Sequence, residues 1–197
     1  MAKKEKFLQK RIIAGEFKNK PIKLPSLSTT RSSKGIVLES FFNTVQFEII
    51  DSIFVEVFSG SGSVGLEALS RGAQKIYFME KDRNALKILQ ENINSLDPSR
   101  CEVYGGDSFI NIKTIVNMLQ KRNQEAYFYI DPPFSFREGF EDIYEQTMQL
   151  IASLPTEVVK LIAVEHMTGL ELPQSLGKFE KTKSKKFGKT SLTYYLA

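Results

Sequence analysis

Short apolar segments alternate with longer amphipathic segments from residue 53 to residue 165. The apolar segments are rich in β-branched and aromatic residues, as buried strands are, and they cover 53–58, 75–79, 101–104, 127–130 and 158–165. The intervening segments have apolar residues at helical spacing and cover 63–70, 83–94, 109–119 and 140–154. Strands that alternate with helices form a parallel sheet with helices on both faces. The pattern therefore predicts an α/β fold.

Acidic residues stand at or just beyond the ends of four of these strands, and they are Glu56, Glu80, Asp107 and Asp131. In open α/β sheets, ligands bind outside the carboxyl ends of the strands. We therefore predict that the four carboxylates belong to one binding site.

The loop after the first strand is rich in glycine. Residues 58–65 read FSGSGSVG and contain Gly-x-Gly-x-x-Gly between a strand and a helix. Glycines at this spacing allow a tight turn and a close approach of the backbone to a ligand. Glu80, at the end of the second strand, can accept hydrogen bonds from both hydroxyls of a ribose. Any adenosine-containing ligand has such a ribose, so these features do not identify the whole ligand. The loop lacks the Gly-Lys-Ser/Thr of a nucleoside triphosphate P-loop, which excludes that kind of site.

Glu56 narrows the choice of ligand. It lies inside the strand, two residues before the loop, where a dinucleotide-binding fold usually has an apolar residue. We expect its carboxylate to face the pocket, where it would repel a pyrophosphate and attract a cationic group. S-adenosylmethionine carries an ammonium and a sulfonium and no phosphate, so it suits this position.

The segment Asp131-Pro132-Pro133-Phe134 follows the fourth strand. Each proline fixes its own φ and disfavours helix at the residue before it, so the segment is stiff and extended. It offers a fixed carboxylate, fixed carbonyl oxygens and an aromatic ring, which together suit a planar amine such as a nucleobase. The alternative interpretation is a turn that only ends the strand.

Charge is unevenly distributed along the chain. Residues 1–34 carry +8 and residues 178–189 carry +5, whereas residues 35–177 carry −9. Basic segments of this density commonly contact phosphate backbones. We divide the chain into a basic N-terminal extension, 1–34, with a short β-hairpin over 11–24, and a catalytic domain, 35–197. The candidate RNA-binding residues are Arg11, Lys18, Lys20, Arg31, Lys34, Lys185 and Lys186.

Further elements are predicted near the start and at the end of the catalytic domain. Apolar residues recur at helical spacing over 34–50, and residues 178–187 and 190–196 have the character of an antiparallel strand pair. Tyr194 and Tyr195, in that pair, are expected to be core or strand residues.

Composition excludes several classes of protein. One cysteine, Cys101, and one histidine, His166, rule out a disulfide framework and argue against a His/Cys zinc site or a histidine-dependent hydrolase. Both residues are expected to be structural. No apolar stretch is long enough for a bilayer, and the N-terminus lacks the apolar core of a secretory signal. We expect a cytoplasmic monomer that holds no metal.

Several motifs resemble a known family. VEVFSGSG at 55–62 resembles motif I of the class I S-adenosylmethionine-dependent methyltransferases, and DPPF at 131–134 resembles their amino-group motif. More closely, the chain resembles the bacterial 16S rRNA guanine 2-amino methyltransferase family. That resemblance rests also on RIIAG at 11–15, GLEALSRGA at 65–73 and KFG at 186–188.

The resemblance implies a Rossmann-like fold, with a mostly parallel seven-stranded sheet and a C-terminal antiparallel pair. It implies methyl transfer from S-adenosylmethionine to the 2-amino group of a guanine in 16S rRNA of the small ribosomal subunit. The base would be held by Asp131, Pro132, Pro133 and Phe134. The cofactor would contact Glu56, Phe58, Gly60, Gly62, Glu80, Lys81, Asp107 and Ser108.

The chain departs from the family at a few positions. Glu56 replaces the usual Asp, and Gly35, Ile36 and Leu38 stand where polar or basic residues are usual. Three other functions stay open at this point: an adenine amino methyltransferase on DNA or RNA, an NAD-binding oxidoreductase, and a non-catalytic RNA-binding module.

Overall fold

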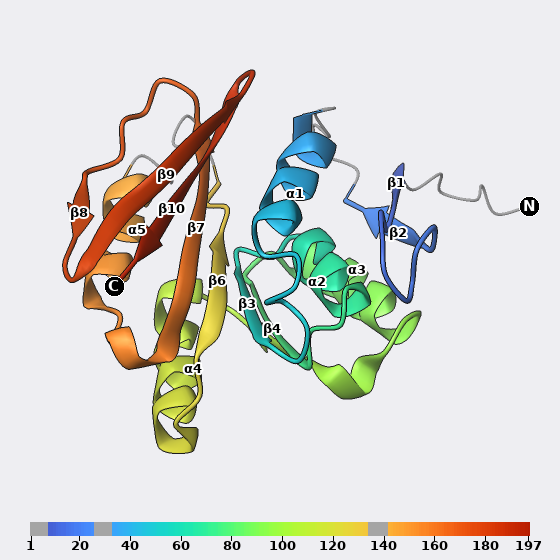
Figure 1. Cartoon of the computed structure of the whole chain (residues 1–197). Coiled ribbons are helices and arrows are strands. Elements are labelled where there is room, and N and C mark those ends of the chain that lie inside the picture. Colours follow the sequence, from blue (N-terminus) through green and yellow to red (C-terminus); the bar gives the residue numbers. More distant parts are fainter. Residues whose placement is uncertain (1–7, 26–32, 134–141) are drawn as a thin grey trace, which may run out of the picture.

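The computed structural model describes residues 8–25, 33–133 and 142–197. Its centre is an eight-stranded sheet with the strand order β5-β4-β3-β6-β7-β10-β9-β8 (Figure 1). The five strands from β5 to β7 are parallel, and β10, β9 and β8 continue the sheet with antiparallel pairing. The strands are β3 (Ile53–Val57), β4 (Lys75–Glu80), β5 (Cys101–Gly105), β6 (Ala126–Ile130), β7 (Val159–Met167), β8 (Ser175–Leu176), β9 (Phe179–Phe187) and β10 (Thr190–Leu196).

Helices cover both faces of this sheet. They are α1 (Ser33–Thr44), α2 (Ser63–Ser70), α3 (Arg83–Asn94), α4 (Ser108–Arg122) and α5 (Ile143–Ser153), with short 3₁₀ turns at Pro98–Arg100 and Thr156–Val158. Side chains of α1, α2 and α3 form one core with one face of the sheet, and those of α4 and α5 form a second core with the other face. The predicted α/β fold with a C-terminal antiparallel pair is therefore confirmed. The eighth strand, β8, was not predicted, because two residues carry no periodic signal.

The predicted helix 34–50 is too long. α1 ends at Thr44, and residues 45–51 form turns. Val45 and Ile49 are nevertheless buried, because the carbonyl of Val45 accepts the N–H of Ile49 and keeps both side chains against the core. Ile36 is one of the apolar residues at helical spacing, but 60% of it is exposed. Apolar spacing alone does not distinguish a continuing helix from a turn that buries the same residues.

The N-terminal hairpin pairs β1 (Leu8–Arg11) with β2 (Pro21–Leu24), so it starts a few residues before the predicted segment. Ile12 and Ile22 join the core beneath α1 and α2. The backbone between the strands is fixed to α2, because the Glu67 carboxylate accepts the N–H groups of residues 13 and 14 at 2.8 and 3.0 Å.

A second side chain joins this hairpin to the rest of the fold. The Asn92 amide accepts the N–H of Lys23 at 2.9 Å and donates to the carbonyls of Lys23 and Ser61 at 3.0 and 2.9 Å. Ser61 belongs to the glycine-rich loop, so one buried amide on α3 contacts both the hairpin and that loop.

Among the residues that the structure describes, no helix is both long enough and apolar enough to cross a membrane.

Candidate active site at the carboxyl edge of the sheet

The Glu56 carboxylate accepts hydrogen bonds from the backbone of α2. Its side chain is only 4% exposed, and its two oxygens accept the backbone N–H groups of Val64 at 3.2 Å and Gly65 at 2.8 Å. These donors lie in the first turn of α2, where the N–H groups of a helix lack partners in the helix itself. Glu56 on β3 therefore holds the first turn of α2, and with it the end of the glycine-rich loop, in place. These two contacts are structural. The sequence could not show this, because a buried helix terminus and a cationic ligand both favour a carboxylate.

The glycines of the loop have two different uses. A Cβ on Gly62 would lie 2.4 Å from Leu89, and one on Gly65 would lie 2.4 Å from Phe78, so both are required for packing. Gly60 has φ +54, and a Cβ there would meet nothing within 4 Å. Gly60 is therefore the position at which the loop backbone faces open space, as a ligand site requires.

Glu80 lies at the end of β4, beside this loop. Its carboxylate accepts the N–H of Gly60 at 2.6 Å and the N–H of Asp82 at 2.7 Å. A carboxylate has about four acceptor positions, so two bonds to the backbone leave room for two hydroxyl donors. The arrangement fits a ribose that lies above Gly60.

Asp107 and its neighbours form the next part of the edge. Asp107 is the N-cap of α4, since its side chain accepts the N–H of Phe109 at 2.9 Å, and its second oxygen lies 3.8 Å from Nζ of the exposed Lys81. Ser108 is buried. Phe58 adopts φ +63, uncommon for a residue with a side chain, and its ring meets Phe109 edge to face, with centroids 5.5 Å apart. These aromatic rings give that part of the edge an apolar wall.

The base-binding segment begins where β6 ends. β6 lies between β3 and β7 in the sheet, so Asp131 follows the strand next to the glycine-rich loop. Asp131 and Pro133 are half-buried, Pro132 is buried, and Phe134 lies outside the described residues. Two sequence-predicted groups, the loop at 58–62 and the segment at 131–133, are thus at neighbouring strand ends.

Sequence reasoning missed Glu165, a fifth carboxylate at this edge. It lies near the end of β7, is 5% exposed, and accepts a hydrogen bond from the hydroxyl of Tyr129 at 2.8 Å. Burial raises the pKa of the Tyr129 hydroxyl well above its usual range, and the charges of Glu165 and Asp131 raise it further. Because Glu165 is the last residue of the predicted strand 158–165, its position beside Asp131 could have been noticed.

A hollow of about 530 Å³ lies next to this pair of strand ends. It is lined by Met167, Thr168, Gly169, Leu170, Gly188 and Lys189. The last two form the turn between β9 and β10, which is beside the end of β7 because Thr190 pairs with Met167. The hollow therefore extends the same edge of the sheet toward the basic C-terminal hairpin.

Five of the predicted RNA-binding residues lie on the two hairpins that flank α1. Lys18 and Lys20 are exposed on the N-terminal hairpin, and Nη1 of Arg11 donates to the Asn19 carbonyl at 2.8 Å. On the other flank, Nζ of Lys185 donates to Oγ of Ser40 at 3.0 Å, and burial lowers the pKa of this lysine.

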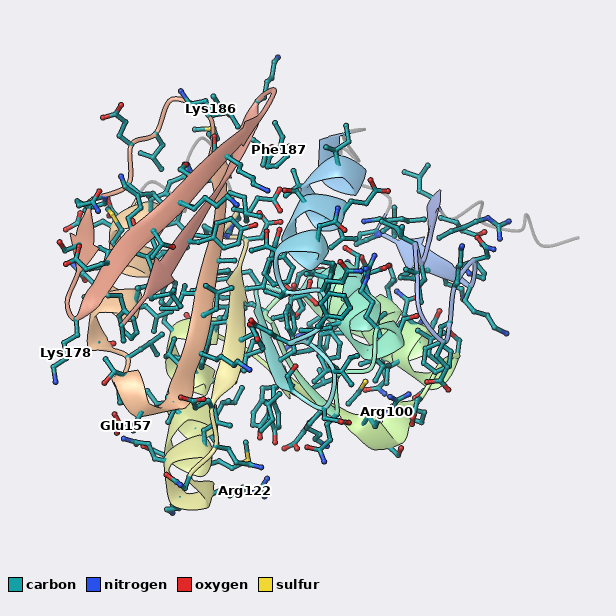
Figure 2. All side chains as sticks on the ribbon, viewed as in Figure 1. Arg100, Arg122, Glu157, Lys178, Lys186 and Phe187 are labelled. Carbon is teal, nitrogen blue, oxygen red and sulfur yellow. The ribbon has the colours of Figure 1, made fainter. Side chains whose placement is uncertain are left out.

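Lys186 is exposed near the turn of the C-terminal hairpin (Figure 2). Figure 1 shows the two hairpins on opposite sides of α1. Arg31 and the side chain of Lys34 lie outside what the structure describes.

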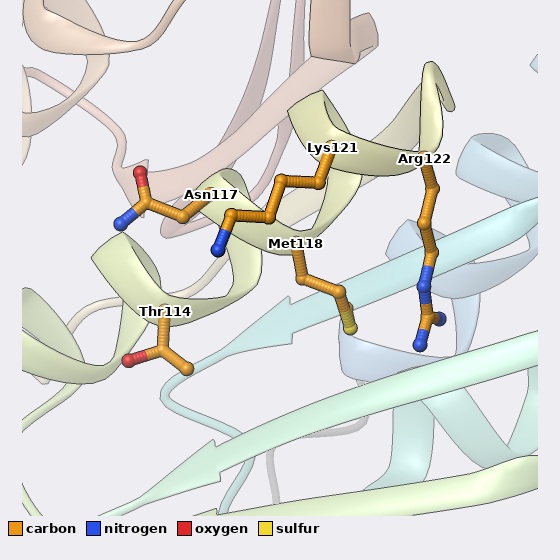
Figure 3. A pocket seen from close by; sticks show the side chains of 5 residues that line it. All are labelled: Thr114, Asn117, Met118, Lys121 and Arg122. Carbon is orange, nitrogen blue, oxygen red and sulfur yellow. The ribbon is translucent and has the colours of Figure 1, made fainter.

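Another hollow, of about 450 Å³, lies away from this edge (Figure 3). All of its lining residues come from α4, namely Thr114, Asn117, Met118, Lys121 and Arg122. It is a groove along one helix, and it brings together none of the predicted site residues.

The fold and this edge can now be compared with known proteins. The model of the family described as Conserved hypothetical protein 95 matches residues 10–196. This chain belongs to that family. The family resemblance inferred from the motifs is therefore confirmed.

Relatives of this Conserved hypothetical protein 95 member carry methyltransferase names. It is 31% identical over 143 residues to the Ribosomal RNA small subunit methyltransferase D of Escherichia coli strain K12, across 73% of this chain and 67% of the relative. It is 28% identical over 194 residues to a Bacillus subtilis protein described as "Putative rRNA methyltransferase YlbH", across 94% of this chain and 97% of the relative.

Solved structures agree on the fold. An Escherichia coli structure described as "Putative methyltransferase yhhF" superposes with a TM-score of 0.74 at 27% identity, over 95% of this chain and 97% of the other. TrmN from Thermus thermophilus, at 14% identity, superposes with a TM-score of 0.59 over 87% of this chain and 50% of the other. The class I methyltransferase fold is therefore confirmed.

Proposed function

We propose that this protein transfers a methyl group from S-adenosylmethionine to the 2-amino group of a guanine in 16S rRNA of the small ribosomal subunit. The observation that carries the proposal is the adjacency of β3 and β6, whose ends bear a nucleoside-type loop and an Asp-Pro-Pro segment. A relative named as a methyltransferase of small-subunit ribosomal RNA supports the same substrate.

The cofactor half is assigned to the loop and to the ends of β4 and β5. Glu80 is the partner for the two ribose hydroxyls, since its carboxylate is already held by two backbone N–H groups. Gly60 allows the close approach of the ligand, and Asp107 is the partner for the adenine amine. Phe58, Lys81 and Ser108 line the same end of the site. Glu56 fixes the loop through α2.

Bound S-adenosylmethionine supplies an electrophilic methyl group on a sulfonium. The exocyclic amine of guanine is a poor nucleophile, because its lone pair is delocalised into the ring. The Asp131 carboxylate and the Pro132 carbonyl each accept one N–H of this amine, which aims the nitrogen and stabilises the positive charge that develops on it. The methyl group would pass to this nitrogen with S-adenosylhomocysteine as the leaving group, and the Asp131 carboxylate would accept the proton that the nitrogen then loses.

Phe134 is proposed to stack on the target base, as aromatic side chains do on unpaired bases. A base held in this way must leave its own stack, which costs least in a loop. The exposed lysines of the two hairpins are proposed to contact the RNA backbone on either side. We propose that the protein acts as a monomer.

Nucleoside analysis of 16S rRNA tests the reaction directly. Cells that lack the protein are expected to lose one N2-methylguanosine, measured by mass spectrometry of rRNA fragments, and the wild-type gene is expected to restore it. Loss of an N6-methyladenosine instead would support the adenine alternative, and an unchanged profile would overturn the proposal.

Ligand titration separates the methyltransferase from an oxidoreductase. We expect calorimetry to detect binding of S-adenosylhomocysteine and no binding of NAD. The reverse result would support the dinucleotide alternative.

A further inference from the structure

We propose that Glu165 selects guanine by accepting a hydrogen bond from the N1–H of the target base. The inference rests on the proposed function and adds to it the residue that distinguishes the base. An Asp-Pro-Pro segment grips an exocyclic amine, which guanine and adenine both possess, so that segment leaves the choice of base open.

The first step is the position of Glu165 beside Asp131. β6 and β7 are parallel, and Ile130, the last residue of β6, pairs with Val164. The chain therefore leaves β6 at Asp131 next to the place where β7 continues with Glu165. Neighbouring strands lie about 4.8 Å apart in the hydrogen-bonding direction. The two carboxylates thus belong to adjacent positions at the same edge of the sheet.

Second, the side chains of Asp131 and Glu165 are expected to lie on the same face of the sheet. Side chains alternate along a strand, and Asp131 directly follows β6, so by this alternation it is expected on the same side of the sheet as Tyr129. The Tyr129 hydroxyl donates to Oε2 of Glu165 at 2.8 Å, which puts Glu165 on that side as well. Both charges raise the pKa of Tyr129, although burial raises it most, as expected if both carboxylates lie near this hydroxyl. A second tyrosine, Tyr144 on α5, has its pKa raised by burial and then by the same two charges.

The third step is chemical complementarity. The edge of guanine next to its 2-amino group carries N1–H, a donor, so a carboxylate beside Asp131 can accept from it while Asp131 accepts from the amine. At the same place adenine has N1 as an acceptor, whose lone pair faces a carboxylate unfavourably. With adenine, the carboxylate would face a lone pair instead of an N–H donor and would gain no hydrogen bond from the base, so Glu165 favours guanine.

The experiment changes the base and the residue together. Once the methylated position is mapped, small subunits are reconstituted with 16S rRNA that carries either guanine or 2-aminopurine there. 2-Aminopurine keeps the 2-amino group but has an acceptor at N1. We expect wild-type protein to methylate guanine at least about 100-fold faster than 2-aminopurine, because a site built around a donor rejects an analogue that lacks it.

The decisive variant is Glu165→Gln. An amide can donate to N1 of 2-aminopurine or accept from N1–H of guanine, so the rate ratio is expected to fall at least about 10-fold. The matched control is Glu48→Gln, since Glu48 is also a partner of a β6 tyrosine, with Tyr127 donating to it at 3.1 Å. Glu48 lies in the turn after α1, and Tyr127 is near the start of β6, at the other end of the strand from Asp131, so this control should keep the wild-type ratio.

A milder pair of variants keeps the test valid if Glu165→Gln does not fold. Tyr129→Phe removes the hydroxyl that orients Glu165 and is expected to lower the ratio about threefold, while Tyr127→Phe should leave it unchanged. Efficient methylation of guanine with the same ratio in the wild type, Glu165→Gln and Tyr129→Phe would overturn the inference alone. No methylation of guanine by the wild type would overturn the proposed function as well.

Discussion

The two halves of the candidate site use carboxylates differently. In the cofactor half, Glu56, Glu80 and Asp107 each accept one or more backbone N–H groups of the loops and helices next to them. In the base half, Asp131 and Glu165 lie at two neighbouring strand ends around the hydroxyl of Tyr129. The first half is held by local backbone contacts, whereas the second depends on pairing between β6 and β7.

Because of this difference, we expect some substitutions to affect folding and others to affect the chemistry. A carboxylate that satisfies buried N–H groups contributes to stability, because its removal leaves those donors without a partner. Asp131 is only half-buried, so its removal should change stability less than the removal of a fully buried carboxylate. Substitutions in the base half should therefore lower turnover, whereas substitutions in the cofactor half should lower stability.

Asp131→Ala should have the largest effect, on turnover. We expect kcat to fall about 10²- to 10³-fold, since a group that stabilises charge in the transition state is lost, while the Kd for S-adenosylhomocysteine changes little. Initial rates on small subunits and calorimetry measure the two quantities. Glu157→Ala, at the opposite end of the sheet (Figure 2), is the control and should retain both. Unchanged turnover in Asp131→Ala would contradict the role of the base half.

Gly65→Ala should have the next largest effect, on stability. Its new Cβ would lie 2.4 Å from Phe78, 2.8 Å from Ile76 and 2.9 Å from Glu56, and such overpacking costs about 1–3 kcal/mol. The Cβ of Gly60→Ala would meet open space, so this variant should lose only the strain energy of its positive φ, about 1 kcal/mol. It should nevertheless weaken S-adenosylhomocysteine binding, because the new methyl group lies where the ligand approaches the loop. Urea unfolding and calorimetry compare the two. Equal stability of both variants would argue against a packing role for Gly65.

Glu56→Gln tests whether the buried carboxylate holds the loop. An amide offers one acceptor atom for the two N–H groups of α2, so we expect about 1–2 kcal/mol lower stability and weaker cofactor binding. Glu67→Gln is a matched control, because Glu67 is also buried and accepts two backbone N–H groups, from Ile13 and Ala14. It should lose comparable stability and keep the wild-type Kd for S-adenosylhomocysteine. A weakened Kd in Glu67→Gln alone would reverse the assignment.

His166 should produce the smallest effect, in the pH dependence of stability. Its ring contacts the Met167 carbonyl and the Thr193 hydroxyl, and burial lowers its pKa. The unfolded chain therefore binds a proton near pH 6.5 while the folded chain stays neutral, so stability should fall as the pH drops below that value. We expect thermal unfolding of His166→Asn to depend less on pH between 7 and 5. A steeper dependence in the variant would contradict a depressed pKa.

Much of the fold could be predicted from the sequence. Helix 83–94 has its predicted bounds, and strand 190–196 has them too. Asp82 caps the helix, and β-branched and aromatic residues are frequent in the strand. The end of α1 was wrong, since the turn at 45–51 buries the same apolar residues as a helix. Tyr194 and Tyr195 are buried as predicted.

Local patterns of side-chain size, polarity and backbone restriction are enough to predict the order of strands and helices, the glycine-rich loop and the Asp-Pro-Pro segment. The contact of Glu56 with α2 and the position of Glu165 beside Asp131 became visible only in the three-dimensional structure. Both outcomes depend on which strands pair and in which register. Register arises from the packing of whole layers, and no single segment of the chain encodes it.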